Sequence, residues 1–250
     1  MAKFHWDVAQ GSAQWFALRS GIPTASEFDS IIQPKKMEPA AARHKYACRL
    51  ICERLMNWQA ESLEGVRHIE AGRENEPLAI AQLEFTSGIT TRPLGFVTTN
   101  DGRFGASPDR AADVAADLSS IGTAIEVKSP QIPTQMQYLL LGHAEAYRCQ
   151  VQGQLYVAEA DKAIFYAFNP RMPPYQVETG RDEVFIVKLR DALERFSDEL
   201  AGHLERAQSL GMFQAFPSVA TPADAEMGTD HNDPDFVEKF LERNAQRMDG

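Results

Sequence analysis

The feature that most constrains the fold is a change of hydrophobic period near Gly88. Residues 40–57 and 73–86 carry apolar side chains at helical spacing, and a glycine such as Gly88 commonly follows a helix end. Three short stretches rich in β-branched and aromatic residues come next, each bounded by Gly, Asn or Pro: ITTRPLGFVTT, GRFGASPD and TAIEVKSP. Helices followed by a group of strands predict a mixed α/β fold.

Further helices and strands are expected on both sides of this group. Thr24 and Glu27 resemble a capping box that opens a short helix ending near Ile32. Towards the C-terminus the expected elements are two helices, two strands and a long amphipathic helix: residues 134–141 and 145–158, DKAIFYAFNP and EVFIVKLR, and residues 191–211. Together these elements predict a mixed central sheet flanked by helices.

The chain is long enough for one sizeable domain, and it has the composition of a soluble protein. It contains 250 residues, of which 44% are hydrophobic and 24% are charged. No apolar run approaches the roughly 20 residues that a membrane span needs, and the N-terminus lacks the apolar stretch of a secretory signal. We therefore expect a cytoplasmic protein with no membrane partner.

The composition changes again near Phe216. Residues 217–250 are rich in Pro, Ala, Asp and Thr, and they hold eight acidic and three basic side chains. Such a segment is typical of a flexible linker, although three apolar residues near its end lie at the spacing of a short helix. We expect a folded domain over residues 1–216 and an acidic, flexible C-terminal extension over residues 217–250.

The net charge of -10 and the pI of about 5.1 argue, taken alone, against nucleic acid as a partner. Half of that charge belongs to the C-terminal extension. Carboxylates gathered to hold a metal ion also count as acidity, although the metal neutralises them. The charge therefore leaves a nucleic-acid function open, with binding through local basic groups.

Three cysteines, an odd number with no CxxC pair, are typical of a reducing compartment in which they remain thiols. Cys48 and Cys52 lie four residues apart and share one helix face. We interpret them as small buried residues, and the alternative is a role in metal binding.

Three charged residues in two neighbouring predicted strands have the chemistry of phosphodiester hydrolysis. SPD ends its strand at Asp109, and EVK, after a polar loop, contains Glu126 and Lys128. The two-residue period of a strand puts Glu126 and Lys128 on one face and turns Val127 towards the core. Carboxylates bind Mg²⁺, which polarises a phosphate and lowers the pKa of a bound water. Lys128 would orient or deprotonate that water, or stabilise charge on the phosphorus.

The pattern by itself also fits an ordinary strand with solvated charges, so the surrounding sequence decides. Six blocks carry a resemblance: WFALRSGIPTASEF (15–28), GRENEPLAIAQLEFTSG (72–88), GASPD (105–109), IEVKSP (125–130), QVQGQLYV (150–157) and FNPRM (168–172). Through these blocks the chain resembles the lambda exonuclease family, the YqaJ-like viral recombinases of the PD-(D/E)xK nuclease superfamily. The resemblance implies a restriction-endonuclease-like α/β fold, with a mixed central sheet flanked by helices.

The resemblance assigns roles to the residues of the expected site. The catalytic lysine of the family matches Lys128. Its metal ligands and a further carboxylate that faces them match Asp109, Glu126, the backbone carbonyl of Val127, and Glu76. The implied cofactor is Mg²⁺, with Mn²⁺ as the alternative. No iron–sulfur cluster is expected, because a single cysteine in the C-terminal half cannot replace the three found in some relatives.

The resemblance also implies a pocket for the 5′ phosphate of the strand being degraded. The residues in the matching blocks are Arg19, Ser26, Ser107 and Gln152. An arginine fork bonds phosphate oxygens bidentately, and hydroxyl and amide groups complete the cage. For Ser107 and Gln152 the alternative is a hydrogen-bonded polar group in the core.

Three further residues are candidates for DNA contacts. Ile69 aligns with an apolar wedge that splits the duplex end, although VRHIEAG differs from the family pattern and an ordinary core or surface isoleucine is the alternative. Lys35 and Lys36 follow the short helix expected after Thr24. They would hold downstream phosphates, unless their loop is merely solvated.

By resemblance we expect a metal-dependent 5′–3′ exonuclease that degrades one strand of linear double-stranded DNA. It would leave 3′ single-stranded overhangs for phage-type homologous recombination. A homotrimeric ring and a single-strand annealing protein of the Red-beta or RecT type are implied in the same way, as is the host cytoplasm if a phage encodes the chain. The alternatives are a PD-(D/E)xK endonuclease or RecB-like module acting on other DNA structures, and a catalytically inactive DNA-binding module.

Overall fold

The computed structural model describes residues 1–57, 67–142, 147–211 and 213, with the backbone alone for residues 67–74. The expected acidic extension, residues 217–250, lies outside the described part. No helix in the described part is long and apolar enough to cross a membrane.

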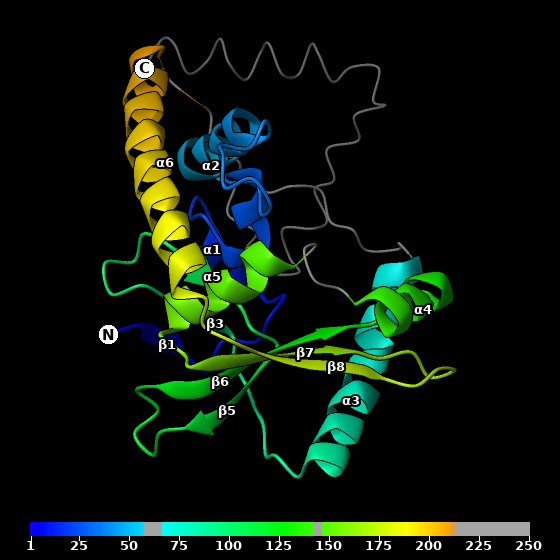
Figure 1. Cartoon of the computed structure of the whole chain (residues 1–250). Coiled ribbons are helices and arrows are strands. Elements are labelled where there is room, and N and C mark those ends of the chain that lie inside the picture. Colours follow the sequence, from blue (N-terminus) through cyan, green and yellow to red (C-terminus); the bar gives the residue numbers. More distant parts are fainter. Residues whose placement is uncertain (58–66, 143–146, 212, 214–250) are drawn as a thin grey trace, which may run out of the picture. The chain divides into compact units, whose positions relative to one another are not determined.

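A mixed five-stranded sheet forms the centre of the described fold (Figure 1). Its strands, in spatial order, are β2 (Arg92–Pro93), β5 (Arg110–Val114), β6 (Ile121–Lys128), β7 (Lys162–Ala167) and β8 (Tyr175–Gly180). β6 pairs antiparallel with β5 and parallel with β7. The parallel pair needs a crossover, which contains α4 (Ile132–Leu141) and α5 (Arg148–Ala158). The predicted mixed α/β sheet with flanking helices is confirmed.

Both faces of this sheet are buried, because its central strands carry apolar side chains on alternate sides. In β7, Phe165 and Ile164 belong to two different hydrophobic clusters. α3 (Arg67–Ser87) packs against one face through Ala79 and Leu83. The other face meets α5, and α6 (Glu183–Ser209) packs on α5; both helices lie above the sheet in Figure 1. β6 is therefore held between two helical layers.

A smaller sheet joins the N-terminal segment to the region just before Asp109. It consists of β1 (Lys3–His5), β3 (Phe96–Thr98) and β4 (Gly105–Ala106). Gly105 forms a bridge with Thr24, and its N–H donates to the carbonyl of Pro23 at 3.0 Å. This bridge brings the N-terminal elements α1 (Ala13–Arg19) and η1 (Ala25–Ser30) beside residue Ser107.

The expected helices over residues 40–57 and 73–86 are present as α2 (Arg43–Met56) and as α3, which begins earlier than predicted. Gly88 adopts a φ of +69° and donates its N–H to Glu84, as expected for a residue that ends a helix. Two of the later helices are confirmed as α4 and α5, although the expected start of the second lies outside the described residues.

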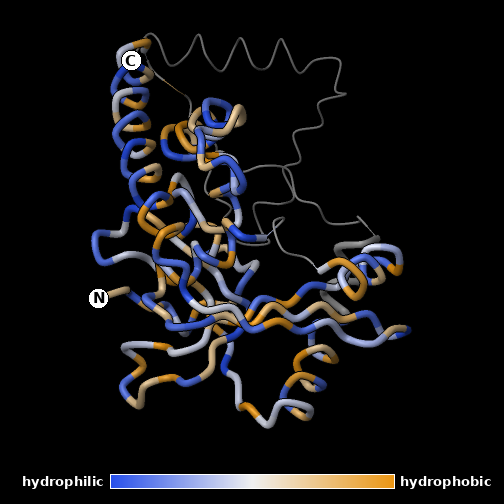
Figure 2. Tube along the Cα trace, viewed as in Figure 1, coloured by the Kyte–Doolittle hydropathy of each residue, from blue (hydrophilic) through white to orange (hydrophobic). Residues whose placement is uncertain are grey.

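The prediction of a strand over residues 183–190 is wrong, because this segment opens α6. Its apolar residues belong to one helical stripe that continues to Leu200 and is visible in Figure 2 as alternating colours. The stripe consists of Phe185, Ile186, Leu189, Leu193, Phe196 and Leu200. Asp182 caps the helix by accepting the N–H of Phe185 at 3.0 Å. A short apolar run alone does not separate a strand from a helix.

Two strands of the main sheet and one helix cap differ from the prediction. The expected strand ending at Asp109 stops at β4, and β5 begins directly after Asp109 in what looked like a polar loop. β8 was also not predicted. The capping-box interpretation of Thr24 and Glu27 is wrong. η1 does begin after Thr24, but the Thr24 side chain makes no cap bond and instead accepts a hydrogen bond from Arg19.

Candidate active site

The two carboxylates of the predicted hydrolytic site lie where β5 begins and β6 ends. Asp109 directly precedes β5, which pairs with β6. Its Oδ2 accepts a hydrogen bond from the N–H of Val127 at 2.6 Å. The Asp109 carboxylate is therefore hydrogen-bonded to the backbone of Val127, the residue between Glu126 and Lys128.

Strand alternation places the remaining charged groups as predicted. Val127 is buried in the cluster that packs under α3. Glu126 and Lys128 point to the opposite side, where the Lys128 ammonium donates to Oε1 of Glu126. The same ammonium lies 5.3 Å from the ring centroid of Tyr147. Glu126 is only 2% exposed, so its charge depends on these partners.

Two glutamines of α5, which we call the glutamine pair (Gln150 and Gln154), hold Glu126 from the other side. Gln150 Nε2 donates to Oε1 at 2.6 Å, and Gln154 Nε2 donates to Oε2 at 2.5 Å. The two residues are four positions apart and therefore share one face of the helix. Both oxygens of Glu126 are hydrogen-bonded as a result.

Burial and neighbouring charges shift the pKa values of Asp109 and Lys128. Burial raises the pKa of Asp109 well above its usual range, and the Glu126 charge adds to this rise while Lys128 opposes it. Burial alone would lower the pKa of Lys128, but the charges of Glu126 and Asp109 outweigh it and raise that pKa. Carboxylates that repel each other in a partly dry site are typical of a place where a cation binds.

Glu76 reaches this region from α3. Burial raises the pKa of Glu76, the guanidinium of Arg110 opposes the rise, and the Glu126 charge adds to it. Arg110 is fixed by hydrogen bonds from Nε to the hydroxyl of Thr91 at 2.9 Å and from Nη2 to its carbonyl at 3.2 Å. Thr91 in turn donates to Glu84 of α3. The structure thus connects the start of β5 with the helix that carries Glu76.

The donor set fits a hard divalent cation. Within the described residues, no three His, Cys, Asp or Glu side chains are arranged to hold a metal by themselves. Mg²⁺ nevertheless needs only one or two carboxylates, because water and substrate oxygens complete its shell. Asp109 and Glu126 would supply these carboxylates, and such a cation would relieve their mutual repulsion.

A second polar cluster includes Ser107, which precedes Asp109 by two residues. We call it the Arg19 cluster; it consists of Trp15, Arg19, Thr24, Ser26 and Ser107. Arg19 donates from Nη1 to Ser107 at 3.2 Å and from Nη2 to Thr24 at 3.3 Å and Ser26 at 3.5 Å. Its guanidinium also lies 4.2 Å from the ring centroid of Trp15. The structure therefore brings together three of the four residues predicted for the 5′-phosphate pocket.

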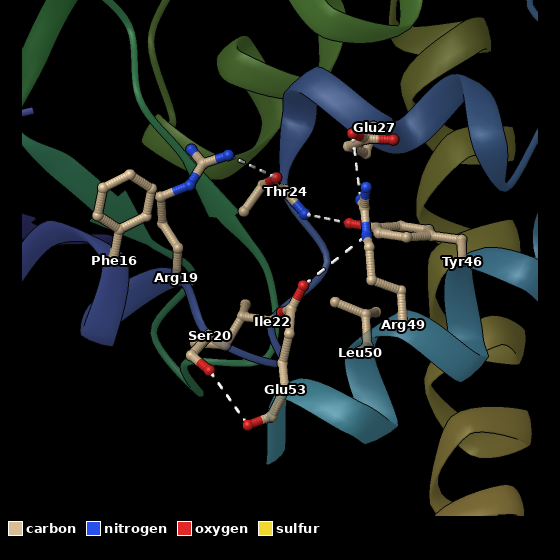
Figure 3. A pocket seen from close by; sticks show the side chains of 10 residues that line it. All are labelled: Phe16, Arg19, Ser20, Ile22, Thr24, Glu27, Tyr46, Arg49, Leu50 and Glu53. Atoms are coloured by element: carbon tan, nitrogen blue, oxygen red, sulfur yellow. Dashed lines mark hydrogen bonds and ion pairs between the residues drawn. The ribbon is translucent and has the colours of Figure 1, made fainter. Parts of the chain in front are cut away.

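A cavity of about 190 Å³ opens next to Arg19 (Figure 3). Arg49 lies on its far side and pairs with Glu27 at 3.1 Å and with Glu53 at 3.7 Å. Tyr46 lines the same cavity, and its hydroxyl oxygen accepts the N–H of Thr24 at 3.1 Å. Burial lowers the pKa of Arg19, but an arginine remains cationic in proteins. Among the described residues, the cavity thus has one arginine, Arg49, that pairs with carboxylates and one, Arg19, whose hydrogen bonds go to neutral hydroxyls.

The fourth predicted residue, Gln152, is not brought into the Arg19 cluster. Its Nε2 donates to the carbonyl of Gly180 at 3.0 Å, and its Oε1 accepts the N–H of Asp182 at 2.9 Å. It is 3% exposed and joins the end of β8 to the start of α6. The expectation of a phosphate contact is corrected here to the alternative, a hydrogen-bonded polar group in the core.

The other predicted DNA contacts either make no hydrogen bond to these clusters within the described part or lie beyond the described side chains. Lys35 and Lys36 are exposed in a turn after η1. Ile69 falls in α3, but its side chain lies outside the described part. Cys48 is exposed and Cys52 is half-buried, so the interpretation of both as buried residues is wrong for Cys48.

Several residues of both clusters were not predicted. The glutamine pair stands in QVQGQLYV, where spacing by four was the available signal, but the sequence does not say which helix face meets Glu126. Trp15 and Thr24 complete the Arg19 cluster, and the positive charge of Arg110 acts on Glu76. These roles depend on long-range contacts that no local pattern encodes.

Comparisons with known proteins show the family of the chain. The model of the YqaJ-like viral recombinase domain matches residues 14–161, which is more than half of the chain and includes Arg19, Ser107, Asp109 and Lys128. No curated protein matches the chain.

Solved structures show the same fold. An alkaline exonuclease (LHK-Exo) from Laribacter hongkongensis is 25% identical, with a TM-score of 0.68 over 80% of this chain and 100% of that chain. A structure of LHK-Exo in complex with dAMP is 27% identical, with a TM-score of 0.69 over the same 80% and 100%. A phage related exonuclease from Haemophilus somnus, 16% identical with a TM-score of 0.52, covers 73% of this chain and 96% of its own.

These neighbours and the matched family indicate a nuclease of the lambda exonuclease type with a PD-(D/E)xK fold. The chain belongs to the family of YqaJ-like viral recombinase domains.

Proposed function

We propose that the chain is a divalent-metal-dependent exonuclease that degrades one strand of linear double-stranded DNA from its 5′ end. The observation that carries the proposal is the short connection between the two clusters. Ser107 belongs to the Arg19 cluster, and Asp109, only two residues later, belongs to the hydrolytic site. A terminal phosphate bound at Arg19 would therefore lie close to the carboxylates of the hydrolytic site.

The Arg19 cluster has the chemistry of a terminal-phosphate site. In the described part of the chain the Arg19 guanidinium bonds neutral hydroxyls alone, and a phosphate monoester would add charge-assisted bonds that these hydroxyls cannot supply. The Trp15 ring fixes the plane of the Arg19 fork by stacking. An enzyme that cuts within a strand has no use for such a site, because internal phosphates are diesters.

The hydrolytic site supplies the remaining groups. Asp109, Glu126 and the Val127 carbonyl would hold Mg²⁺ or Mn²⁺, with Glu76 nearby; the bound ion polarises the phosphate and lowers the pKa of water. Lys128 orients the attacking water and stabilises the negative charge that develops on the phosphate oxygens. Water adds to phosphorus, the bond to the 3′ oxygen breaks, and a 5′-mononucleotide leaves. The neighbour in complex with dAMP holds a molecule of this class.

The broader role also belongs to the proposal. Removal of one strand leaves a 3′ single-stranded overhang, the substrate of a single-strand annealing protein of the Red-beta or RecT type. Three copies would form a ring that keeps hold of the DNA without a broadly basic surface, which suits a chain with a net charge of -10.

The deciding assay uses a 5′-phosphorylated linear duplex with one labelled strand, with and without Mg²⁺. We expect mononucleotides released from the 5′ end only when Mg²⁺ is present, and no release from Lys128→Ala. Digestion from the 3′ end would contradict the polarity.

A nicked and a covalently closed circle separate the rivals. Cutting of the closed circle would favour an endonuclease, and activity on forked or single-stranded substrates alone would favour a RecB-like module. Binding of duplex ends with no hydrolysis under any divalent metal would favour a catalytically inactive DNA-binding module.

A further inference from the structure

Glu126 is surrounded by more donors than a metal ligand needs. Its Oε1 accepts from Lys128 and from Gln150, and its Oε2 accepts from Gln154. A carboxylate offers about four lone-pair sites, two on each oxygen. Three donors therefore leave one free site, and it is on Oε2.

The glutamine pair is built into a rigid part of the molecule. Gln154 is 1% exposed, and α5 packs so closely against η1 that a Cβ on Gly153 would meet the ring of Phe28 at 2.6 Å. The helix cannot shift towards or away from β6 without breaking this packing. The amide groups are consequently fixed relative to Glu126.

Gln154 also has an unused acceptor. Its Oε1 is buried and has no hydrogen-bond partner among the described residues. An unpaired buried acceptor is costly, because it has lost its water without gaining another donor, so it is expected to find a donor in the working protein. The amide cannot simply be turned over, because its oxygen would then face the Glu126 carboxylate.

We propose that Gln154, assisted by Gln150, is a positioning residue that presents Oε2 of Glu126 to the divalent metal, and that Oε1 of Gln154 accepts a hydrogen bond from a water molecule of the loaded site. This inference rests on the proposed function. The pair keeps Oε1 of Glu126 turned to Lys128, so Oε2 would be the oxygen available to the metal. Groups that orient a metal ligand typically change metal affinity by about 10–100-fold when removed.

Gln135 provides a matched control. It is also fully buried, its Nε2 donates to the carbonyls of Ala167 and Pro173, and its Oε1 is likewise buried without a partner in the described part. Gln135→Leu removes the same chemical group from an equally buried place but touches no group of Glu126. Any effect of lost burial or packing should therefore be common to Gln135→Leu and Gln154→Leu.

The experiment measures Mn²⁺ binding by calorimetry in the full chain, with thermal unfolding of each variant recorded first. We expect Gln154→Leu to weaken Mn²⁺ binding about tenfold or more and Gln150→Leu to weaken it less, because Gln150 shares Oε1 with Lys128. Gln135→Leu should bind Mn²⁺ as the wild type does. If Gln154→Leu does not fold, Gln154→Asn, which withdraws the amide by one methylene, should show the same direction.

Equal Mn²⁺ affinity in the folded Gln154 variants and the wild type would overturn the inference, and so would an equal loss in Gln135→Leu. In both cases a wild type that binds Mn²⁺ and cuts DNA would leave the proposed function intact. A wild type that binds no Mn²⁺ and cuts no DNA would overturn the proposed function itself.

Discussion

Asp109 accepts the backbone N–H of Val127 at 2.6 Å, so the first carboxylate of the site takes the place that a strand carbonyl would occupy in the ladder beside β6. The position of the carboxylate follows from sheet pairing rather than from a flexible loop. Any change that moves β5 relative to β6 would also move Asp109 relative to Glu126.

Removal of the charged groups of the hydrolytic site should abolish cutting without unfolding the chain. We expect Asp109→Asn, Glu126→Gln and Lys128→Ala each to lose Mg²⁺-dependent release of nucleotides from linear duplex DNA. Activity within tenfold of wild type, about 1.4 kcal/mol of barrier, would place the site elsewhere. Asp117→Asn is the control, because Asp117 is an exposed loop residue whose hydrogen bonds within the described part go to Ser119.

The Arg19 cluster predicts a preference for phosphorylated ends. A 5′-hydroxyl end should be cut about tenfold or more slowly than a 5′-phosphate end, the scale of one charge-assisted hydrogen bond. Arg19→Ala should remove most of that difference, whereas Arg190→Ala on the exposed face of α6 should leave it unchanged. The preference is measured as the ratio of initial rates on two duplexes that differ only in the 5′ phosphate. Equal rates of the wild type on both ends would refute the assignment.

A ring should be visible as an oligomer of three chains. Light scattering of the purified protein should give about three times the chain mass of 27.8 kDa. Addition of excess competitor DNA during digestion should not stop chains already engaged, because a ring cannot dissociate sideways. A monomeric mass together with immediate loss of activity on adding competitor would argue against the ring.

Asp101 should make a pH-dependent contribution to stability. Burial would raise its pKa, but hydrogen bonds from Thr99 and Arg103 outweigh this and lower the pKa to about 2. Its unfolded pKa is about 3.9, so the contribution is complete above that pH and is lost as the pH falls towards 2. Asp101→Asn should be less stable than wild type at pH 7 by at most about 1 kcal/mol, since the side chain is half exposed. Urea unfolding should show the same stability gap at pH 7 and pH 5 and a smaller gap at pH 3, and an unchanged gap at pH 3 would contradict the prediction.

The contact between α5 and η1 should tolerate no added volume. In Gly153→Ala the new Cβ would meet Phe28 at 2.6 Å and Ala25 at 3.2 Å, and the Phe28 ring is completely buried. We expect a loss of about 1–3 kcal/mol in the free energy of unfolding. Gly202→Ala in α6 meets nothing within 4 Å and should instead stabilise by up to about 1 kcal/mol. Urea denaturation of the two variants decides whether the contact is as tight as described.

The part of the site that follows strand periodicity could be predicted from sequence. EVK requires Glu126 and Lys128 to share a face, and the burial of Val127 agrees. β5 could not be predicted, because Ala111 and Ala112 are buried on opposite faces but have little tendency to form strands. The prediction of a strand over residues 183–190 is wrong because so short an apolar run does not distinguish the two-residue period of a strand from the 3.6-residue period of a helix.

The grouping of Arg19 with Ser26 and Ser107 came from family resemblance, since residues 88 positions apart carry no local signal of contact. Gln152 shows that a role assigned by family resemblance can disagree with the position of the side chain in the fold. Its neighbours Gln150 and Gln154 face Glu126, while Gln152 points to the other side of the helix and bonds the turn before α6. A helix face is determined by packing, and that information appears only in the folded chain.

The parallel pairing of β6 with β7 determines when the site can exist during synthesis. When Asp109, Glu126 and Lys128 have been synthesised, the glutamine pair of α5 and strand β7 have not. β7 is the strand that pairs in parallel with β6. Parallel strands cannot pair until the crossover between them is complete. A nascent chain therefore contains the catalytic residues before it can form the active site. The site can assemble only after Ala167, the last residue of β7, has emerged from the ribosome.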